Sequence, residues 1–128
     1  MKHIIIITYS FAKQIKHVRM KGSYLGEFQE LVLLAILSLG EDAYGVSIQK
    51  AIKETAGRDI TRGALHSALS RLEEKNYLDS RFSEATKKRG GRRKKIYEVT
   101  ASGRNALKHA QQVRDKFMST IKTEIQYG

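Results

Sequence analysis

The hydrophobic period of this chain changes after Asn76, and this change limits the folds that the chain can adopt. Up to that point, three segments carry apolar residues three or four positions apart, which is typical of helices buried on one face. Beyond it, two short segments alternate apolar and polar residues, as strands do, before a last segment returns to helical spacing. The order of three helices, a β-hairpin and a long helix predicts a mainly α (α+β) fold.

The first helical segment, residues 25–39, is apolar on nearly every side and is followed by Gly40, a common helix stop. A helix of this kind must be buried on more than one face. In a domain this small, we expect a partner subunit to cover part of it. The residues that we assign to this dimer interface are Phe28, Leu31, Val32 and Ala35.

The second and third segments predict shorter amphipathic helices. We expect Asp42 to cap the second helix and Gly57 to end it. Thr61 is the expected cap of the third helix. Its apolar stripe, at the spacing i, i+3, i+4, i+7, consists of Leu65, Ala68, Leu69 and Leu72.

The hairpin and the last helix follow from the remaining pattern. Leu78, Ser80 and Phe82 alternate with polar neighbours, and residues 95–100 have the β-branched and aromatic content of a second strand. Thr100 is the expected cap of a last helix of about 25 residues, which would be roughly 37 Å long. Because this helix is too long to bury against the small domain, we expect its outer half to meet another chain. The residues assigned to that dimer interface are Val113, Phe117, Ile121 and Ile125. A second interpretation is that the same stripe lines a cavity for a small-molecule effector between the subunits.

The net charge of +11 is concentrated in two short segments. Residues 1–21 hold five basic residues and no acid, and residues 86–95 hold seven basic residues and no acid. The rest of the chain has 12 basic against 13 acidic residues, so it is close to neutral. This distribution is typical of a surface that binds a polyanion, although a basic cluster by itself is more often a solvated charge run.

The second basic segment stands between two strands and follows an amphipathic helix, and this context favours DNA. Three helices and a hairpin match a winged helix-turn-helix, in which the third helix enters the major groove and the hairpin, or wing, contacts the backbone or minor groove. The candidate DNA contacts on the recognition helix are Thr61, Arg62, Gly63, His66, Ser67, Ser70 and Arg71. The candidate contacts on the wing are Lys87, Lys88, Arg89, Gly90, Gly91, Arg92, Arg93, Lys94 and Lys95.

Two of these candidates also have a structural interpretation. Arg71 can pair with an acid of its own domain, Glu74 or Glu98. Gly63 either lets the helix approach a phosphate closely or simply avoids a clash.

We divide the chain into an N-terminal basic extension (residues 1–22), a winged helix-turn-helix domain (residues 23–100) and a dimerisation helix (residues 101–128). The extension is interpreted either as a segment of little function, with translation starting at Met20, or as a basic arm that adds DNA contacts. Its uninterrupted apolar run, residues 4–7, is too short for a signal peptide or a membrane span. We therefore expect a cytoplasmic protein without a membrane partner.

Enzymatic and metal-binding functions find no support in the sequence. The chain has no cysteine, which excludes disulfides and thiolate zinc sites. Its histidines, at positions 3, 17, 66 and 109, lack metal-ligand spacing, and no phosphate-binding loop or catalytic triad is recognisable. We expect no catalytic residue, no metal and no cofactor.

Four stretches carry a family resemblance in this order: LGEFQELVLLAIL, AYGVSIQKAI, TRGALHSALSRLEEKNYL and RGGRRKKIYEVTASGRNAL. They cover Leu25 to Leu107 and resemble the PadR family of bacterial transcriptional regulators. The resemblance implies a homodimeric winged-helix protein, usually a repressor, whose last helix is swapped against the partner's first. The short tail is similar to that of the smaller PadR branch. His66 and Ser67 stand where many relatives have Tyr-Pro, so base preference does not transfer.

These observations together predict a sequence-specific DNA-binding transcriptional regulator, a homodimeric repressor whose operator is an inverted repeat in double-stranded DNA. Two alternatives remain at this stage. One is a non-specific nucleic-acid-binding protein of the nucleoid or of RNA, and the other is a protein-interaction adaptor.

Overall fold

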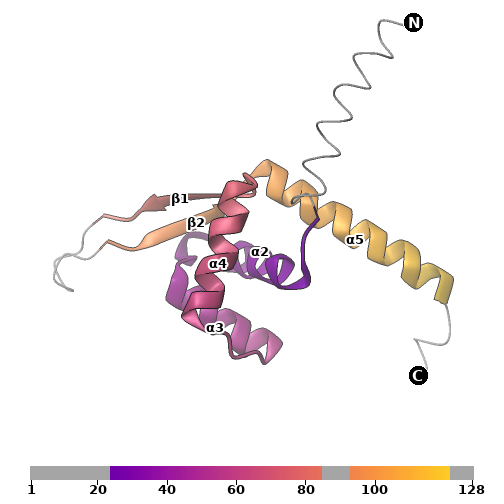
Figure 1. Ribbon diagram of the computed structural model, residues 1–128, viewed down its shortest axis with the longest axis horizontal. Helices are drawn as coiled ribbons and strands as arrows, with labels where there is room; N and C mark the ends of the chain where they lie inside the picture. Colours follow the sequence, from indigo (N-terminus) through magenta and orange to yellow (C-terminus); the bar gives the residue numbers. More distant parts are fainter. Residues whose placement is uncertain (1–23, 85–92, 122–128) are drawn as a thin grey trace, which may run out of the picture.

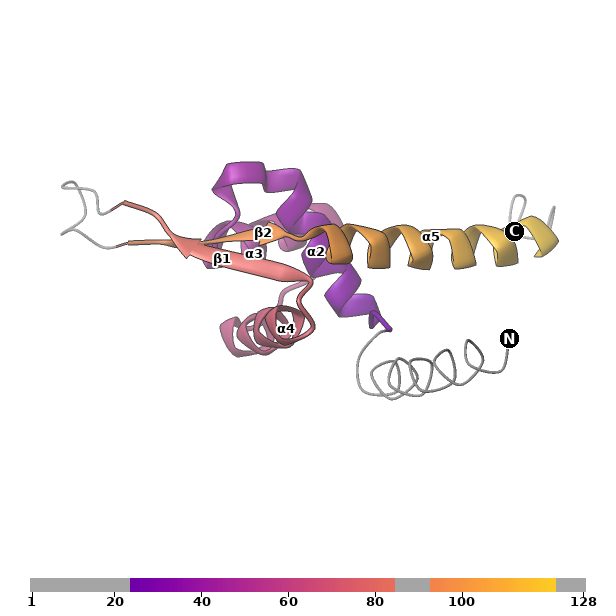
Figure 2. The same cartoon turned by 90° about the horizontal axis from the view of Figure 1, so that it is seen from above.

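The computed structural model describes residues 24–84 and 93–121. Its elements follow in the order α2 (Glu27–Leu39), the 3-10 turn η2 (Gly40–Asp42), α3 (Gly45–Ala56), α4 (Arg62–Glu74), β1 (Leu78–Phe82), β2 (Lys95–Val99) and α5 (Ala101–Ile121). In Figures 1 and 2, α2, α3 and α4 cluster at the centre, while the hairpin extends to one side and α5 to the other. The predicted mainly α (α+β) winged-helix fold is confirmed.

One hydrophobic core forms where the three short helices meet the base of the hairpin. Side chains with at most 5% exposure come from every one of these elements, and they include Leu33, Ile36, Ile48, Ile52, Leu65, Leu69, Leu72, Leu78, Tyr97 and Val99. The apolar stripe predicted on the third helix is the side of α4 that enters this core. The opposite side of α4 is left open.

The central position of α2 corrects part of the expected dimer interface. Val32 is fully buried and Ala35 is only 8% exposed within the single protomer. Both side chains belong to the protomer's own core, because α2 packs against α3, α4 and β2 at once. They are therefore not available to a partner. Leu34, which the sequence did not single out, is 50% exposed.

Four of the five predicted helix ends are confirmed. Gly40 follows the last residue of α2 as its C-cap. Gly57 ends α3 in the left-handed conformation at φ 67°, and Thr61 caps α4 by accepting a hydrogen bond from the Ala64 N–H at 3.0 Å. Thr100 caps α5 in the same way, with the Gly103 N–H as donor at 3.0 Å. Asp42 as the cap of α3 is wrong.

The cap of α3 lies two residues later than expected, because the chain makes the turn η2 after α2. Tyr44 is the N-cap residue, and its backbone N–H donates to the Ser47 hydroxyl at 3.0 Å. Tyr44 also forms an isolated antiparallel bridge with Ile96, and the Tyr97 N–H donates to the Ala43 carbonyl at 2.8 Å. The segment around Ala43 and Tyr44 therefore pairs with β2, on the side of β2 that β1 does not occupy.

The hairpin pairs β1 and β2 in antiparallel register from Leu78–Val99 to Phe82–Lys95. Leu78 is 2% exposed, whereas Phe82 is 63% exposed. The expected alternation is present, but the hairpin extends beyond the core before Phe82 is reached. Leu78 and Phe82 therefore share the inner face of the hairpin, but only Leu78 is buried.

The start of α5 is pressed against the base of the hairpin. Gly103 is buried, and a Cβ atom at this position would lie only 2.4 Å from the Tyr77 carbonyl oxygen. Beyond Leu107, which packs against the core, the helix runs outward. The 21 residues of α5 correspond to about 31 Å of helix.

Candidate nucleic-acid interface

The polar side of α4 is open to solvent along its length. All residues assigned to DNA contact on this helix are exposed, namely Thr61, Arg62, Gly63, His66, Ser67, Ser70 and Arg71. On the opposite side, Leu65, Leu69 and Leu72 are at most 1% exposed. Because an α-helix has about 3.6 residues per turn, these exposed residues form one continuous polar stripe.

The beginning of α4 is held by contacts on both sides of the turn that precedes it. Thr61 Oγ1 satisfies one of the free N–H groups of the first helical turn. The side-chain amide of Gln49, on α3, donates to the Ile60 carbonyl at 2.7 Å. Arg62 therefore stands on a supported turn, and it forms no ion pair within the described part of the chain.

Glu73 ties the end of α4 to the hairpin. Its Oε2 accepts a hydrogen bond from the Ser80 hydroxyl of β1 at 3.0 Å, and its Oε1 lies 3.4 Å from Lys95 Nζ of β2. One carboxylate thus contacts both strands and fixes α4 relative to the hairpin. The sequence interpretation missed this residue, because the partners are 7 and 22 positions away and nothing in the local pattern marks them.

Two wing lysines have partners inside the domain. Lys95 forms the ion pair with Glu73, and its ammonium lies 5.5 Å from the centre of the Tyr97 ring. The Lys94 ammonium lies 4.0 Å from the centre of the Tyr44 ring, an attractive cation–π geometry. These lysines consequently hold the hairpin to the body of the domain.

Arg93 is the remaining wing candidate in the described residues, and its side chain is exposed. It comes just before the point at which the two sides of the hairpin begin to pair. At that place the Ser83 N–H donates to the Lys94 carbonyl at 2.8 Å, and the Lys94 N–H donates to the Ser83 hydroxyl at 2.9 Å. The other wing candidates lie outside the described residues; they are Lys87, Lys88, Arg89, Gly90, Gly91 and Arg92.

The structural interpretations of Gly63 and Arg71 are not supported. A Cβ atom at Gly63 would meet nothing within 4 Å in the protomer, so no internal clash requires glycine there. Arg71 pairs with neither Glu74 nor Glu98, and the ion pairs between described residues do not include it. Both positions therefore remain open on the polar stripe.

Lys75, just beyond α4, has a purely structural position. Its ammonium donates to Gln29 Oε1 at 2.7 Å and to the Tyr24 carbonyl at 3.1 Å. Burial, together with the neighbouring charge of Arg71, lowers the pKa of Lys75. This lysine connects α4 to the segment around α2 rather than facing the open side.

The outward half of α5 carries the apolar stripe assigned to the dimer. Val113 is 40% exposed and Phe117 is 68% exposed, and Met118 beside them is 49% exposed. Ile121 is half-buried, whereas Ile125 lies outside the described residues. On α2, Phe28 and Leu31 are half-buried and pack against the edge of the core. Among the described residues, α5 thus carries three of the seven exposed large apolar side chains, and the other four are Tyr24, Leu34, Val46 and Phe82.

The direction of α5 is fixed by a charged pair. Arg114 of α5 contacts Glu30 of α2 through two parallel interactions, Nη1 to Oε1 at 2.7 Å and Nη2 to Oε2 at 2.9 Å. The Glu30 side chain is only 8% exposed, so its carboxylate depends on this partner. The pair joins α5 to α2 at the centre of the protomer.

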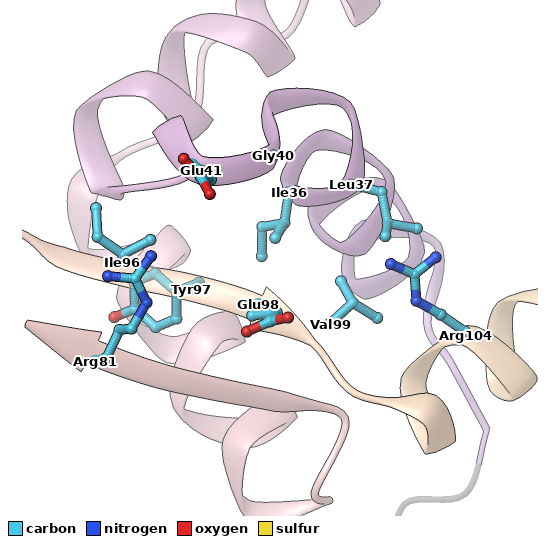
Figure 3. Close-up of a pocket in the computed structure, with 10 residues that line it drawn as sticks. All are labelled: Ile36, Leu37, Gly40, Glu41, Arg81, Ile96, Tyr97, Glu98, Val99 and Arg104. Carbon is cyan, nitrogen blue, oxygen red and sulfur yellow. The ribbon is translucent and has the colours of Figure 1, made fainter.

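A depression of about 240 Å³ lies between the end of α2, η2, β2 and the first turn of α5 (Figure 3). Ile36 and Val99 contribute to its apolar wall. Charged side chains of both signs surround it: Glu41, Arg81, Glu98 and Arg104. By strand alternation, Arg81 points to the face of the hairpin opposite to Ser80 and α4. The depression is therefore separate from the polar stripe, and its mixed charge does not suit a polyanion.

Neither a candidate metal site nor a candidate membrane span is found in the part of the chain that the structure describes. No group of three His, Asp or Glu side chains in residues 24–84 and 93–121 could hold a metal ion. None of the helices in these same ranges is long and apolar enough to cross a membrane.

Solved structures share this arrangement. A PadR family transcription regulator from Clostridium difficile R20291 superposes with a TM-score of 0.60 at 27% identity, covering 77% of this chain and 98% of its own. A PadR-like transcription factor from Bacteroides fragilis gives a TM-score of 0.62 at 24% identity, with 84% and 95% covered. A PadR family regulator from Eggerthella lenta DSM 2243 gives 0.58 at 19% identity, with 97% and 99% covered.

The family comparison agrees with the structural one. A comparison with curated proteins found no match. The model of the transcriptional regulator PadR-like family, however, matches residues 33–109, which is more than half of the chain. This match includes α3, α4, both strands and the first turns of α5, so it covers the elements that carry the candidate DNA contacts. The chain belongs to the PadR-like family of transcriptional regulators.

Proposed function

We propose that this protein is a homodimeric, sequence-specific repressor that binds an inverted-repeat operator in double-stranded DNA. The observation that carries the proposal is the exposed polar stripe of α4 held beside a basic wing by Glu73. The stripe can reach base edges in the major groove, while the wing contacts the phosphate backbone. Binding of DNA rather than catalysis is the activity, and it takes place in the cytoplasm.

The roles of the polar residues differ by position. Arg62 stands at the start of α4, where a recognition helix contacts base edges, so we assign it to base or phosphate contact. His66, Ser67 and Ser70 follow on the same side and can donate to or accept from bases. Arg93 contacts the backbone together with the basic run that lies outside the described residues.

The homodimer is inferred from the exposed apolar stripe on α5. Val113 and Phe117 lie on one side of a helix whose outer half leaves the body of the protomer. Covering them requires a second chain, and the same stripe of that chain supplies a matching apolar surface. Two recognition helices related by a two-fold axis read half-sites about one helical turn apart, roughly 34–36 Å. A small-molecule effector between the two α5 helices would then act by changing this spacing.

The dimer is tested by Phe117→Glu. We expect sedimentation equilibrium to give a dimer for the wild-type protein and a monomer for the variant, because a buried charge at the interface is not compensated. Lys116→Glu, one residue earlier on the same exposed helix, is the matched control and should remain dimeric. A wild-type monomer at micromolar concentration, or a dimer that both substitutions leave intact, contradicts the dimer assignment.

The DNA interface is tested by the salt dependence of binding. With about six to eight phosphates neutralised per dimer, the plot of log Kobs against log salt should have a slope near −5 to −7. Arg93→Ala should weaken binding to all duplexes and flatten the slope by about 2, one contact for each protomer. The matched control is Arg81→Ala, since Arg81 belongs to the same hairpin but points to the other face. Equal slopes for wild type and Arg93→Ala would remove this part of the wing from the interface.

A further inference from the structure

Phe82 is a large aromatic side chain exposed at the end of a charged hairpin. It is 63% exposed and does not belong to the hydrophobic core. Leu78, Tyr97 and Val99 provide the buried apolar surface of this hairpin, each with at most 5% exposure. Packing inside the protomer therefore does not account for an aromatic residue at this position.

The face on which Phe82 lies is defined by its neighbours. Successive residues of a strand point to opposite faces, so Phe82 shares a face with Ser80. The Ser80 hydroxyl donates to Glu73 of α4, which places this face on the side of the recognition helix. Lys95, directly opposite Phe82 in the ladder, reaches the same carboxylate. In Figure 2, α4 lies on one side of the hairpin, and the hairpin extends past the helix at the end where β1 finishes.

The charges around Phe82 indicate which partner covers it. Lys95, the ladder partner of Phe82, is paired with Glu73, whereas Arg93, two positions before Lys95, is exposed and forms no ion pair within the described residues. In the sequence, the segment 86–95 that joins the strands carries no acid. Any partner that brings negative charge to this face also brings its own surface onto the aromatic ring. In duplex DNA, the surface next to the phosphates is that of the deoxyribose rings and the edge of the minor groove, which are apolar enough to contact a phenyl ring.

We propose that Phe82 makes an apolar contact with the sugar edge of bound DNA, between the phosphates held by the wing and the groove read by α4. This inference rests on the proposed DNA-binding function and assigns a contact that is neither a base-edge hydrogen bond nor a phosphate ion pair. Such a contact adds affinity that does not depend on salt.

The first test separates the apolar contribution from the ionic one. Phe82→Ala should raise the Kd for duplex DNA roughly tenfold, since most of an exposed phenyl ring is covered on binding. The salt slope should stay unchanged, in contrast to that of Arg93→Ala. Phe82→Leu, which keeps an apolar side chain, should recover a large part of the affinity. Thermal unfolding followed by circular dichroism serves as the folding control, and an exposed position should leave it unchanged.

The second test uses the absence of tryptophan from the chain. Phe82→Trp introduces a single tryptophan, whose emission should be quenched or shifted when operator DNA is added. Arg81→Trp places the probe one residue earlier on the opposite face of the strand, and its emission should not respond. Phosphate at high concentration provides a control without sugars and should leave both variants unchanged.

The outcomes distinguish this inference from the function on which it rests. If the wild-type protein binds no DNA, the proposed function fails. If DNA binds but Phe82→Ala keeps the wild-type Kd, or both tryptophan variants respond equally, the assignment of Phe82 is wrong while DNA binding stands. An emission change in Phe82→Trp that follows protein concentration without DNA would indicate a protein partner instead, and would also overturn the assignment.

Discussion

Replacing Gly103 by alanine tests how closely α5 is pressed onto the winged domain. The added Cβ atom would lie 2.4 Å from the Tyr77 carbonyl oxygen and 2.8 Å from Cγ1 of Val99. The carbonyl cannot move away freely, because it accepts a hydrogen bond from the Thr100 N–H at 3.0 Å. The Thr100 side chain in turn caps α5. The substitution must therefore displace the first turn of α5 from the hairpin.

The expected magnitude combines two opposing contributions. Overpacking a tight site costs about 1–3 kcal/mol, and the lost Thr100–Tyr77 hydrogen bond adds about 1 kcal/mol. Alanine recovers up to about 1 kcal/mol through its higher helix propensity. We expect the free energy of unfolding to fall by roughly 1–3 kcal/mol. Gly63→Ala is the matched control, because Gly63 also lies in the first turn of a helix and a Cβ there meets nothing within 4 Å.

The assay is urea unfolding followed by circular dichroism at one fixed protomer concentration, since stability depends on concentration if the protein dimerises. Gly103→Ala should be destabilised, whereas Gly63→Ala should be unchanged or more stable by up to about 1 kcal/mol. Equal stability of the two variants would refute the close packing of α5. If Gly63→Ala is stable but binds DNA more weakly, its glycine serves the approach of a phosphate.

Three further substitutions examine the contacts that organise the domain. Arg114→Ala leaves the buried carboxylate of Glu30 without its partner and should lower the free energy of unfolding by about 1–3 kcal/mol, as measured by urea titration. An unchanged unfolding midpoint would show that the pair contributes nothing to stability. Burial raises the pKa of Tyr97, so its contribution to stability is complete below the unfolded pKa of about 10 and is lost as the pH rises beyond it. Tyr97→Phe should therefore lose less stability than wild type between pH 9 and pH 11, and parallel losses would speak against this assignment. Glu73→Ala removes the contacts between α4 and the hairpin and should reduce the ratio of operator affinity to random-duplex affinity. Glu74→Ala, which changes an exposed acid without a hairpin contact, should leave this ratio unchanged. Equal ratios for both variants would show that Glu73 has no role in DNA recognition.

Local chemistry explains why the helices and most of their ends could be predicted from the sequence. The hydrophobic period and the caps Gly57, Thr61 and Thr100 act within a few residues of one another, so they can be read directly along the chain. Asp42 failed as a cap for the opposite reason. The position of the α3 start depends on the pairing of Tyr44 with Ile96, which lies 52 positions away in the chain and has no local signature.

The limits of prediction for the site have the same physical origin. The exposed side of α4 was predicted because one apolar stripe defines the opposite face. On α2, which is apolar nearly all round, the pattern does not distinguish residues buried in the protomer, such as Val32, from exposed ones such as Leu34. Alternation in β1 gives the face of Phe82 but not its distance from the core. The contacts of Glu73 with Ser80 and Lys95 could not be predicted from the sequence, since they join three separate elements, α4, β1 and β2.

The central claim is that this protein recognises a particular DNA sequence, and competition binding tests it most directly. Fluorescence anisotropy would follow the purified protein on labelled DNA from upstream of its own gene, with random duplex as competitor across a salt series. We predict a complex of dimer size that survives an excess of random DNA and weakens with a slope near −5 to −7. Equal affinity for both duplexes, falling steeply with salt, would instead indicate a non-specific nucleic-acid-binding protein and contradict the assignment as a sequence-specific repressor.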